Sequence, residues 1–354
     1  MKIKLAILEK DTSYLNRLVS AFGTKYADKF EIYSFTDKAV AMDNIDKAKI
    51  DVFVAGSEFE IDTEILPRRC GFAYFVESIE IDTYKNQMAI CKYQKADLIY
   101  KQILSIYSEN AGNISGLKLG EDVSRVIFYT SVSGGTGSSS MAVATAMHYA
   151  TVGHKVIYLN FEPFGSTDTY FSAEGQFDMS DVIFALKSKK TNLSLKLESC
   201  VKTDITGVNF YSQTKLALDM MELGSDEVIH LLSELQLTGS YDYIIVDMPF
   251  ALEKNTLEVL KQAHSIVWVS DGSVESNTKI KRAFDSLVMK EQGTELDISE
   301  RLCIVYNKFS NKTGRVIDEE MIRNVGGAPR FEHATTEQVV KQLSTMSFFE
   351  ALIK

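Results

Sequence analysis

The sequence of 354 residues predicts an α/β protein with two domains. Apolar runs typical of buried strands alternate with the apolar periodicity of helices along most of the chain. This alternation is interrupted over residues 108–122 by a stretch rich in Gly, Ser and Asn. Beyond it the predicted strands are more continuously apolar, as in a doubly wound sheet covered on both faces. We therefore predict a first domain over 1–107, a linker over 108–122 and a second domain over 123–354.

Five strands are expected in the first domain, at residues 4–8, 30–35, 51–55, 72–76 and 87–91. After the first strand, Leu15, Leu18, Val19 and Phe22 have helical spacing, and the apolar positions of 98–106 form a second helical stripe. Strands that alternate with helices over this length favour a parallel sheet with flanking helices.

Six strands are expected in the second domain, at residues 126–131, 155–160, 208–211, 243–247, 265–270 and 302–307. Ser225 is expected to cap a helix that buries Val228, Leu231, Leu232 and Leu235. The last residues, 348–354, are apolar but few and poor in basic side chains. They therefore favour a packing helix over an amphipathic membrane helix.

The composition argues against several classes of protein. A net charge of -10 argues against non-specific nucleic-acid binding, which depends on neutralising phosphates with Lys and Arg. The four cysteines show no CxxC pair and no Cys/His metal spacing, which indicates free thiols in a reducing cytoplasm. No apolar run approaches the ~18 residues needed to cross a bilayer. The sequence therefore predicts a cytoplasmic protein whose membrane association is only indirect.

A glycine-rich segment lies between the predicted strand 126–131 and the helix that follows it. Its residues are Ser133, Gly134, Gly135, Thr136, Gly137, Ser138, Ser139 and Ser140. A turn of this kind directs successive backbone N–H groups into one concavity, and the helix N-terminus adds partial positive charge. The segment therefore predicts a phosphate cradle. Ser138 stands where such loops carry a lysine, so slow hydrolysis is expected. Alternatively, the turn serves only tight packing.

A predicted metal site depends on the strand 243–247, which ends in a carboxylate. Asp247 at a strand end facing the loop can hold Mg²⁺ through water, while Ser139 supplies a hydroxyl ligand. An Asp at a strand end is more often a turn cap when it occurs alone. After a glycine-rich loop of this type, the metal-binding interpretation is favoured.

The acidic residues after the strand 155–160 are candidates for the catalytic role of orienting the attacking water. Glu162 lies nearest the strand end and is the first candidate, and Asp168 is the second. A plain acidic loop is an alternative of nearly equal weight.

The base of a nucleotide is expected to meet the end of the strand 302–307. The Asn307 amide can make paired hydrogen bonds to an adenine edge. Ser310 stands where a guanine-binding NKxD motif needs Asp, so ATP or ADP is preferred to GTP. Pro329 and Arg330 follow a Gly-Gly turn and are candidates for a wall of the base pocket, with an ordinary loop as the alternative.

Residues 1–107 resemble a response-regulator receiver domain. Glu9 and Asp11 follow the first strand, where receivers carry acidic metal-binding residues. The phosphoacceptor Asp of receivers ends the third strand, but residues 55–57 read Ala-Gly-Ser here. The resemblance therefore implies a degenerate receiver used for protein contact. Lys92 or Lys95 lies near the usual receiver lysine, with a structural role expected in the absence of the acceptor.

The second domain resembles the MinD/ParA class of P-loop ATPases, whose loop has the form KGGxGK[ST]. Both lysines are replaced by serine in this chain, at Ser133 and Ser138. In the family the first lysine reaches the phosphates of a dimer partner and the second steadies the β- and γ-phosphates. Their loss implies weaker binding and weak or absent hydrolysis. The acidic pair of the family's second strand is half retained, as Asn160 and Glu162.

The fold class implied by both resemblances is α/β, with an N-terminal receiver-like (CheY-like) α/β domain and a C-terminal doubly wound P-loop NTPase domain. This pairing resembles the TadZ/CpaE group, which localises type IVb (Flp/Tad) pilus machinery. The resemblance implies ATP and Mg²⁺ as cofactors, a nucleotide-sandwich homodimer, and pilus assembly proteins bound through the receiver-like domain. It also implies recruitment to the cell pole or the inner membrane face. The alternatives are a nucleotide-free scaffold and an active partitioning or division-site ATPase.

Overall fold

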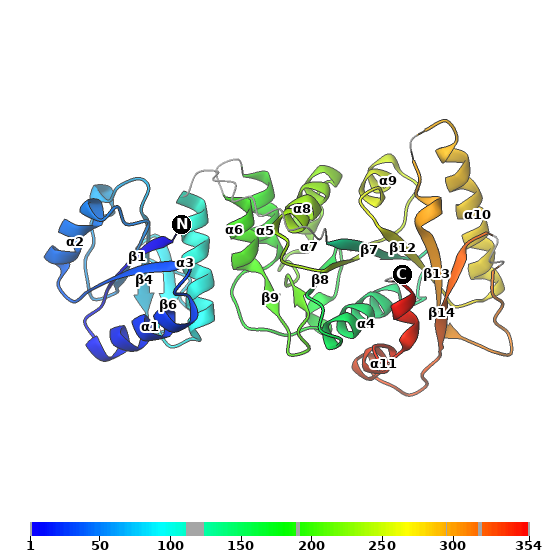
Figure 1. Cartoon of the computed structure of the whole chain (residues 1–354), viewed down its shortest axis with the longest axis horizontal. Coiled ribbons are helices and arrows are strands. Elements are labelled where there is room, and N and C mark those ends of the chain that lie inside the picture. The colour runs from blue at the N-terminus through cyan, green and yellow to red at the C-terminus, as the bar shows by residue number, and fades with distance from the viewer. Residues whose placement is uncertain (1, 111–123, 189–191, 295, 318–320, 353–354) are drawn as a thin grey trace. The chain divides into compact units, whose positions relative to one another are not determined.

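The computed structural model describes residues 2–110, 124–188, 192–294, 296–317 and 321–352. The chain forms two compact units (Figure 1). The first comprises Met1–Gly116 and Lys187–Cys200, and the second comprises Leu117–Leu186 and Val201–Lys354. Each unit contains one mainly parallel sheet with helices packed against it.

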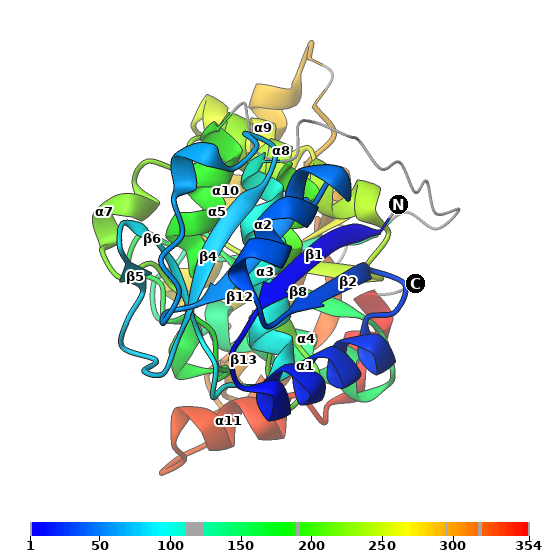
Figure 2. The same cartoon turned by 90° about the vertical axis from the view of Figure 1, so that its left-hand side faces the viewer.

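The first unit contains a six-stranded sheet in the order β2-β1-β3-β4-β6-β5, parallel except for the short β5 (Figure 2). Side chains alternate between the two sheet faces, so one face packs on α1 and α3 and the other on α2. The bounds of its elements are β1 Ile3–Leu8, α1 Thr12–Lys25, β2 Phe30–Phe35, α2 Lys38–Lys47, β3 Val52–Gly56, η1 Thr63–Ile65, β4 Gly71–Val76, β5 Thr83–Tyr84, β6 Gln87–Cys91, α3 Ala96–Asn110 and α6 Leu193–Cys200.

Helix α6 belongs to the first unit although the sequence places it inside the second predicted domain. It packs along α3, where the Tyr100 hydroxyl donates to Glu198 Oε1 at 2.8 Å. The Lys196 ammonium is buried and donates to Ser105 Oγ at 2.5 Å. Helix α3 itself continues to Asn110, so the chain remains helical beyond residue 107. Most of the predicted linker, 111–122, lies outside the described residues.

A buried ion pair lies at the carboxyl edge of the first sheet. Lys92 Nζ lies 2.8 Å from Glu9 Oε2, and the two side chains are 10% and 1% exposed. Burial opposes the charge on Lys92, but the hydrogen bond and charge of Glu9 outweigh it and raise the lysine pKa. This pair gives Lys92 a structural contact, the kind of role expected for Lys92 or Lys95 in the absence of a phosphoacceptor.

The second unit contains an eight-stranded sheet in the order β14-β13-β12-β7-β11-β8-β10-β9, parallel except for β9. One face packs on α4, α11 and η4, and the alternate side chains, such as Phe128 and Trp268, are buried on the other face. The bounds of its elements are β7 Arg125–Thr130, α4 Ser138–Thr151, β8 Val156–Asn160, η2 Thr167–Thr169, α5 Met179–Lys187, β9 Lys202–Thr203, β10 Asn209–Phe210, α7 Ala217–Met220, α8 Ser225–Thr238, β11 Tyr243–Asp247, α9 Lys254–Leu260, β12 Ser265–Ser270, α10 Val274–Glu291, η3 Ser299–Arg301, β13 Leu302–Phe309, β14 Arg323–Pro329, α11 Thr336–Leu343 and η4 Ser347–Leu352.

The predicted strands of both domains are present, with shifts of one or two residues at several ends. Strand β14 was not predicted, because its sequence RNVGGAP lacks the apolar or β-branched run that marks a strand. The cap of α8 is Gly224 and not Ser225, since the Glu227 carboxylate accepts from Gly224 N at 3.0 Å. Val228 and Leu231 are buried on that helix as predicted. The C-terminal segment packs as η4, with Phe349 fully buried.

None of the helices in the described part of the chain is long and apolar enough to span a bilayer.

The buried pair between Glu9 and Lys92 supports a stability prediction. Lys92→Met leaves the Glu9 carboxylate buried without its cation, so we expect a loss of about 3–5 kcal/mol in the free energy of unfolding. Urea unfolding of the full chain at pH 7 measures the loss.

Lys25→Met is the matched control, since Lys25 pairs with Asp97 at an exposed site. Its expected cost is at most about 1 kcal/mol. Equal costs for the two variants would contradict the assignment of Glu9 and Lys92 as a buried pair.

Candidate functional site

The glycine-rich loop connects the end of β7 to the start of α4, at the carboxyl edge of the second sheet. Gly137 is the N-cap of α4 with φ 86°, and Gly135 has φ 78°. Both values lie in the left-handed region that favours glycine. The N-cap makes no side-chain hydrogen bond, so the backbone N–H groups of the first turn are not satisfied by a cap. Left-handed glycines before a helix start without a side-chain cap are features that an anion cradle requires.

Two residues at the end of β13 brace this loop. Asn307 Nδ2 donates to the Thr136 carbonyl at 2.8 Å, and Lys308 Nζ donates to the Gly135 carbonyl at 2.7 Å. Asn307 Oδ1 accepts from the Lys308 backbone N–H at 3.0 Å. The Asn307 amide that the sequence assigned to an adenine edge thus supports the loop in this structure. Lys308 was missed as a site residue, although its place directly after Asn307 at a strand end could have suggested it.

Several buried polar atoms around the loop have no hydrogen-bond partner among the described residues. They are Thr130 Oγ1, Ser133 Oγ, Ser138 Oγ and Asp247 Oδ1. Thr130, Ser133 and Asp247 are each at least nine-tenths buried. Leaving such groups unpaired costs free energy, so a cluster of them at one place indicates a polar ligand. Hydroxyl donors beside a cradle and a carboxylate acceptor suit a phosphate chain with a divalent cation.

Asp247 is the most perturbed acidic group of the site. Burial and the charge of Glu162 raise its pKa to about 7, and hydrogen bonding by Ser139 and Tyr158 offsets part of the rise. The carboxylate is 1% exposed at the end of β11. A cation bound at this position would favour the charged form and remove the penalty. Asp247 and Ser139, which the sequence paired as metal ligands, are therefore brought together by the fold.

The two catalytic candidates have different surroundings. Glu162 lies two residues after β8 and is half-buried, and burial raises its pKa. Its charge acts on Asp247, so it faces the same region as the metal ligand. Asp168 is exposed in η2, where its Oδ2 accepts from Gln213 N at 2.8 Å. Asp168 therefore braces a neighbouring loop, and Glu162 is the candidate that the geometry favours.

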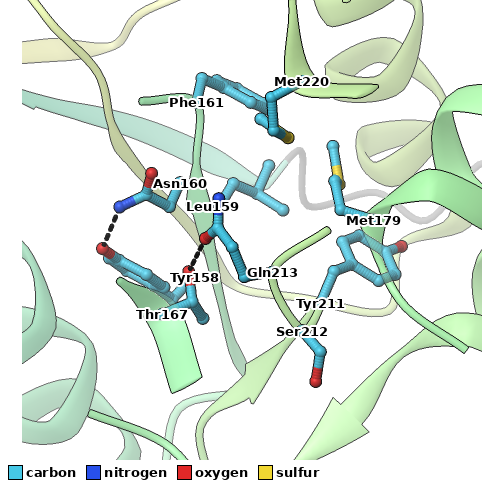
Figure 3. A pocket seen from close by; sticks show the side chains of 10 residues that line it. All are labelled: Tyr158, Leu159, Asn160, Phe161, Thr167, Met179, Tyr211, Ser212, Gln213 and Met220. Atoms are coloured by element: carbon cyan, nitrogen blue, oxygen red, sulfur yellow. Dashed lines mark hydrogen bonds between the residues drawn. The ribbon is translucent and has the colours of Figure 1, made fainter. Parts of the chain in front are cut away.

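Two hollows lie near the carboxyl edge of this sheet. One lies between the ends of β8 and β10 and has a volume of about 10 Å³, enough for about one water molecule (Figure 3). The other is a groove of about 330 Å³ along β13 and β14. Tyr306, Phe309 and Pro329 line it, while Arg330 is exposed and outside its lining. The groove has room for a purine ring.

No group of three or more His, Cys, Asp or Glu side chains within the described ranges is arranged to hold a metal ion. A cation at Asp247 and Ser139 would therefore take its other ligands from phosphate oxygens and water. This is the usual coordination of Mg²⁺ at nucleotide sites.

Residues 1–108 match the family model described as "TadZ-like, receiver domain". The match covers the first sheet, the helices α1 and α2, and most of α3. It confirms the receiver resemblance that Glu9, Asp11 and the strand pattern indicated.

The second unit has the fold of MinD/ParA P-loop ATPases. A ParA family ATPase from Chlorobium tepidum is 22% identical, with a TM-score of 0.50 over 65% of this chain and 96% of that chain. A chain of the MinC:MinD cell division complex of Aquifex aeolicus is 16% identical, with the same TM-score and coverage. Identities this low establish the fold alone. A comparison with curated proteins gave no match.

The requirement for glycine in the loop supports a mutational prediction. A Cβ on Gly137 would overlap Asn307 Nδ2, and the φ of Gly137 is positive, so Gly137→Ala must displace the brace. We expect a loss of roughly 1–3 kcal/mol in unfolding free energy, from backbone strain and the disturbed hydrogen bond. Thermal unfolding measures it.

Gly134→Ala is the matched control, because nothing lies within 4 Å of its Cβ position and its φ is not positive. Its expected effect is within about 0.5 kcal/mol. A Gly137→Ala variant as stable as this control would show that the brace does not depend on glycine.

Proposed function

We propose that this chain is an ATP-binding, dimerising localisation factor that positions Flp/Tad pilus assembly machinery, with weak or no hydrolysis. The observation that carries the proposal is the cluster of unpartnered buried polar atoms around a loop whose helix N-terminus is uncapped, with Asp247 beside it. The TadZ-like match of residues 1–108 supports the assignment to Tad pilus localisation. The fold that the second unit shares with a ParA family ATPase supports nucleotide binding.

Ground-state binding of Mg-ATP needs no lysine from the loop. Backbone N–H groups, the helix N-terminus and Mg²⁺ together neutralise much of the phosphate charge. Lys308, braced on the Gly135 carbonyl, adds a cation beside the loop. The groove lined by Tyr306, Phe309 and Pro329 is the proposed site for the adenine ring. Asp247 and Ser139 would hold the Mg²⁺ ion.

Hydrolysis of ATP requires more of the site than binding does. Charge builds on the transferring phosphoryl group, and a lysine at position 138 would stabilise it in the transition state. Ser138 carries no charge, so the site retains only Glu162 to orient water. The proposed enzyme activity is therefore a slow ATPase or none.

We assign partner recruitment to the first unit because the end of β3 carries no aspartate that could accept a phosphoryl group. Strand β3 ends at Gly56, and no carboxylate follows at Ser57. The space that a side chain at Gly56 would need is filled by the Glu58 carboxylate. Lys92 is already paired with Glu9. A receiver fold without an acceptor suits constant protein contact better than a phosphorylation switch.

Isothermal titration of the full chain with ATP and Mg²⁺ tests the proposal. We expect saturable binding below millimolar concentration, lost in Gly137→Asp, which places a carboxylate in the cradle. Asp285→Asn, on the exposed face of α10, is the control and should bind normally. Sedimentation of the same samples should show a dimer with Mg-ATP. No binding by the wild-type chain would favour the nucleotide-free scaffold.

Restoring the lysine should raise turnover. Ser138→Lys returns a cation to the phosphates, and we expect the ATP hydrolysis rate to rise about 10- to 100-fold above the wild-type rate. Thr151→Lys, at the exposed C-terminal end of α4, should leave the rate unchanged. Phosphate release under single-turnover conditions is the measurement, and equal rates in both variants would argue against a missing loop cation as the limit on hydrolysis.

A further inference from the structure

Asp247 is held from one side by two neutral donors of the neighbouring strand β8. The Tyr158 hydroxyl donates to Asp247 Oδ2 at 3.0 Å, and Asn160 Nδ2 lies 3.2 Å from the same oxygen. Asn160 Nδ2 also donates to the Tyr158 hydroxyl at 3.1 Å, which closes a triangle of hydrogen bonds. Figure 3 shows the Asn160 amide directed at the Tyr158 hydroxyl oxygen.

The sheet register produces this arrangement. Asn160 is the parallel partner of Asp247, and Tyr158, two residues earlier, projects from the same face of β8. All three side chains are at least nine-tenths buried. The donors occupy Oδ2 and leave Oδ1 without a hydrogen-bond partner among the described residues.

We propose that Tyr158 and Asn160 are positioning residues, which hold Asp247 by Oδ2 so that Oδ1 is presented to the hydrated Mg²⁺ of a bound nucleotide. This inference rests on the proposed function. Because both donors are neutral, they orient the carboxylate without cancelling the charge that a cation needs. A lysine or arginine in their place would compete with the metal ion.

Asn160 has a second contact through its amide oxygen. Its Oδ1 accepts from the Glu162 backbone N–H at 2.9 Å, while its Nδ2 reaches Asp247. The amide therefore joins the metal ligand to the loop that carries Glu162. An aspartate at this position would place a second buried negative charge beside Asp247 and provide no donor to it.

The test is the Mg²⁺ dependence of ATP affinity in the full chain, measured by isothermal titration over a range of Mg²⁺ concentrations and in EDTA. Tyr158→Phe keeps the ring and removes the donor. We expect its affinity for ATP to fall about tenfold in Mg²⁺ and to match the wild type in EDTA, since the lost bond is to a charged group. Half-saturating Mg²⁺ should rise accordingly.

Tyr149→Phe is the matched control. Tyr149 is also fully buried in the second unit, where its hydroxyl donates to the Phe349 carbonyl at 2.9 Å. The control should lose stability without any change in Mg²⁺ dependence. Thermal unfolding of both variants separates a loss of folding from a loss of positioning, and Asn160→Ala repeats the test if Tyr158→Phe does not fold.

The outcomes are distinct. A Tyr158→Phe variant that is folded and keeps the wild-type Mg²⁺ dependence overturns the positioning role and leaves the proposed function standing. An equal fall in affinity with Mg²⁺ and in EDTA also overturns it, because the effect would then not pass through the metal ion. A wild-type chain that binds no ATP overturns both the proposed function and this inference.

Discussion

The burial of the Asp247 carboxylate against the turn between β7 and α4 is the constraint on which the functional interpretation depends. The β7–β11 pairing brings the end of β11 beside the end of β7, so the carboxylate and the glycine-rich loop share one edge of the sheet. Burial makes the charge costly, and its neighbours Ser139, Tyr158 and Asn160 are all neutral. We propose that a cation completes the site around a buried acid supported in this way.

The loop has a positive charge beside it although its own sequence contains no lysine. Lys308 contributes a cation from the end of β13, and its backbone has φ 56°, an uncommon conformation for a residue with a side chain. Together with Asn307 it ties two loop carbonyls to β13. The loop is thus braced by β13, and the weak hydrolysis that we propose follows from the absence of a lysine within the loop itself.

In the first unit, structural contacts occupy positions that are reactive in receivers. Where a receiver would carry an acceptor, the Glu58 carboxylate fills the space beside Gly56, and Lys92 is held by Glu9. A helix from a distant part of the sequence, α6, completes the packing of α3 through Tyr100 and Lys196. These contacts favour one stable conformation of the unit, which suits a docking domain.

Local pattern determined the strand and helix order, the glycine-rich loop and the strand-end Asp247, because these depend on periodicity and on residues close in sequence. The sequence alone could not show that α6 packs on α3 or that β14 is a strand. It also could not show that Asn307 and Lys308 hydrogen-bond to carbonyls of the loop. Those outcomes depend on pairing between segments far apart in the chain, where burial and register decide which partner each polar group meets. The triangle of Tyr158, Asn160 and Asp247 is the clearest case, since three ordinary strand residues become one site only when β8 and β11 lie side by side.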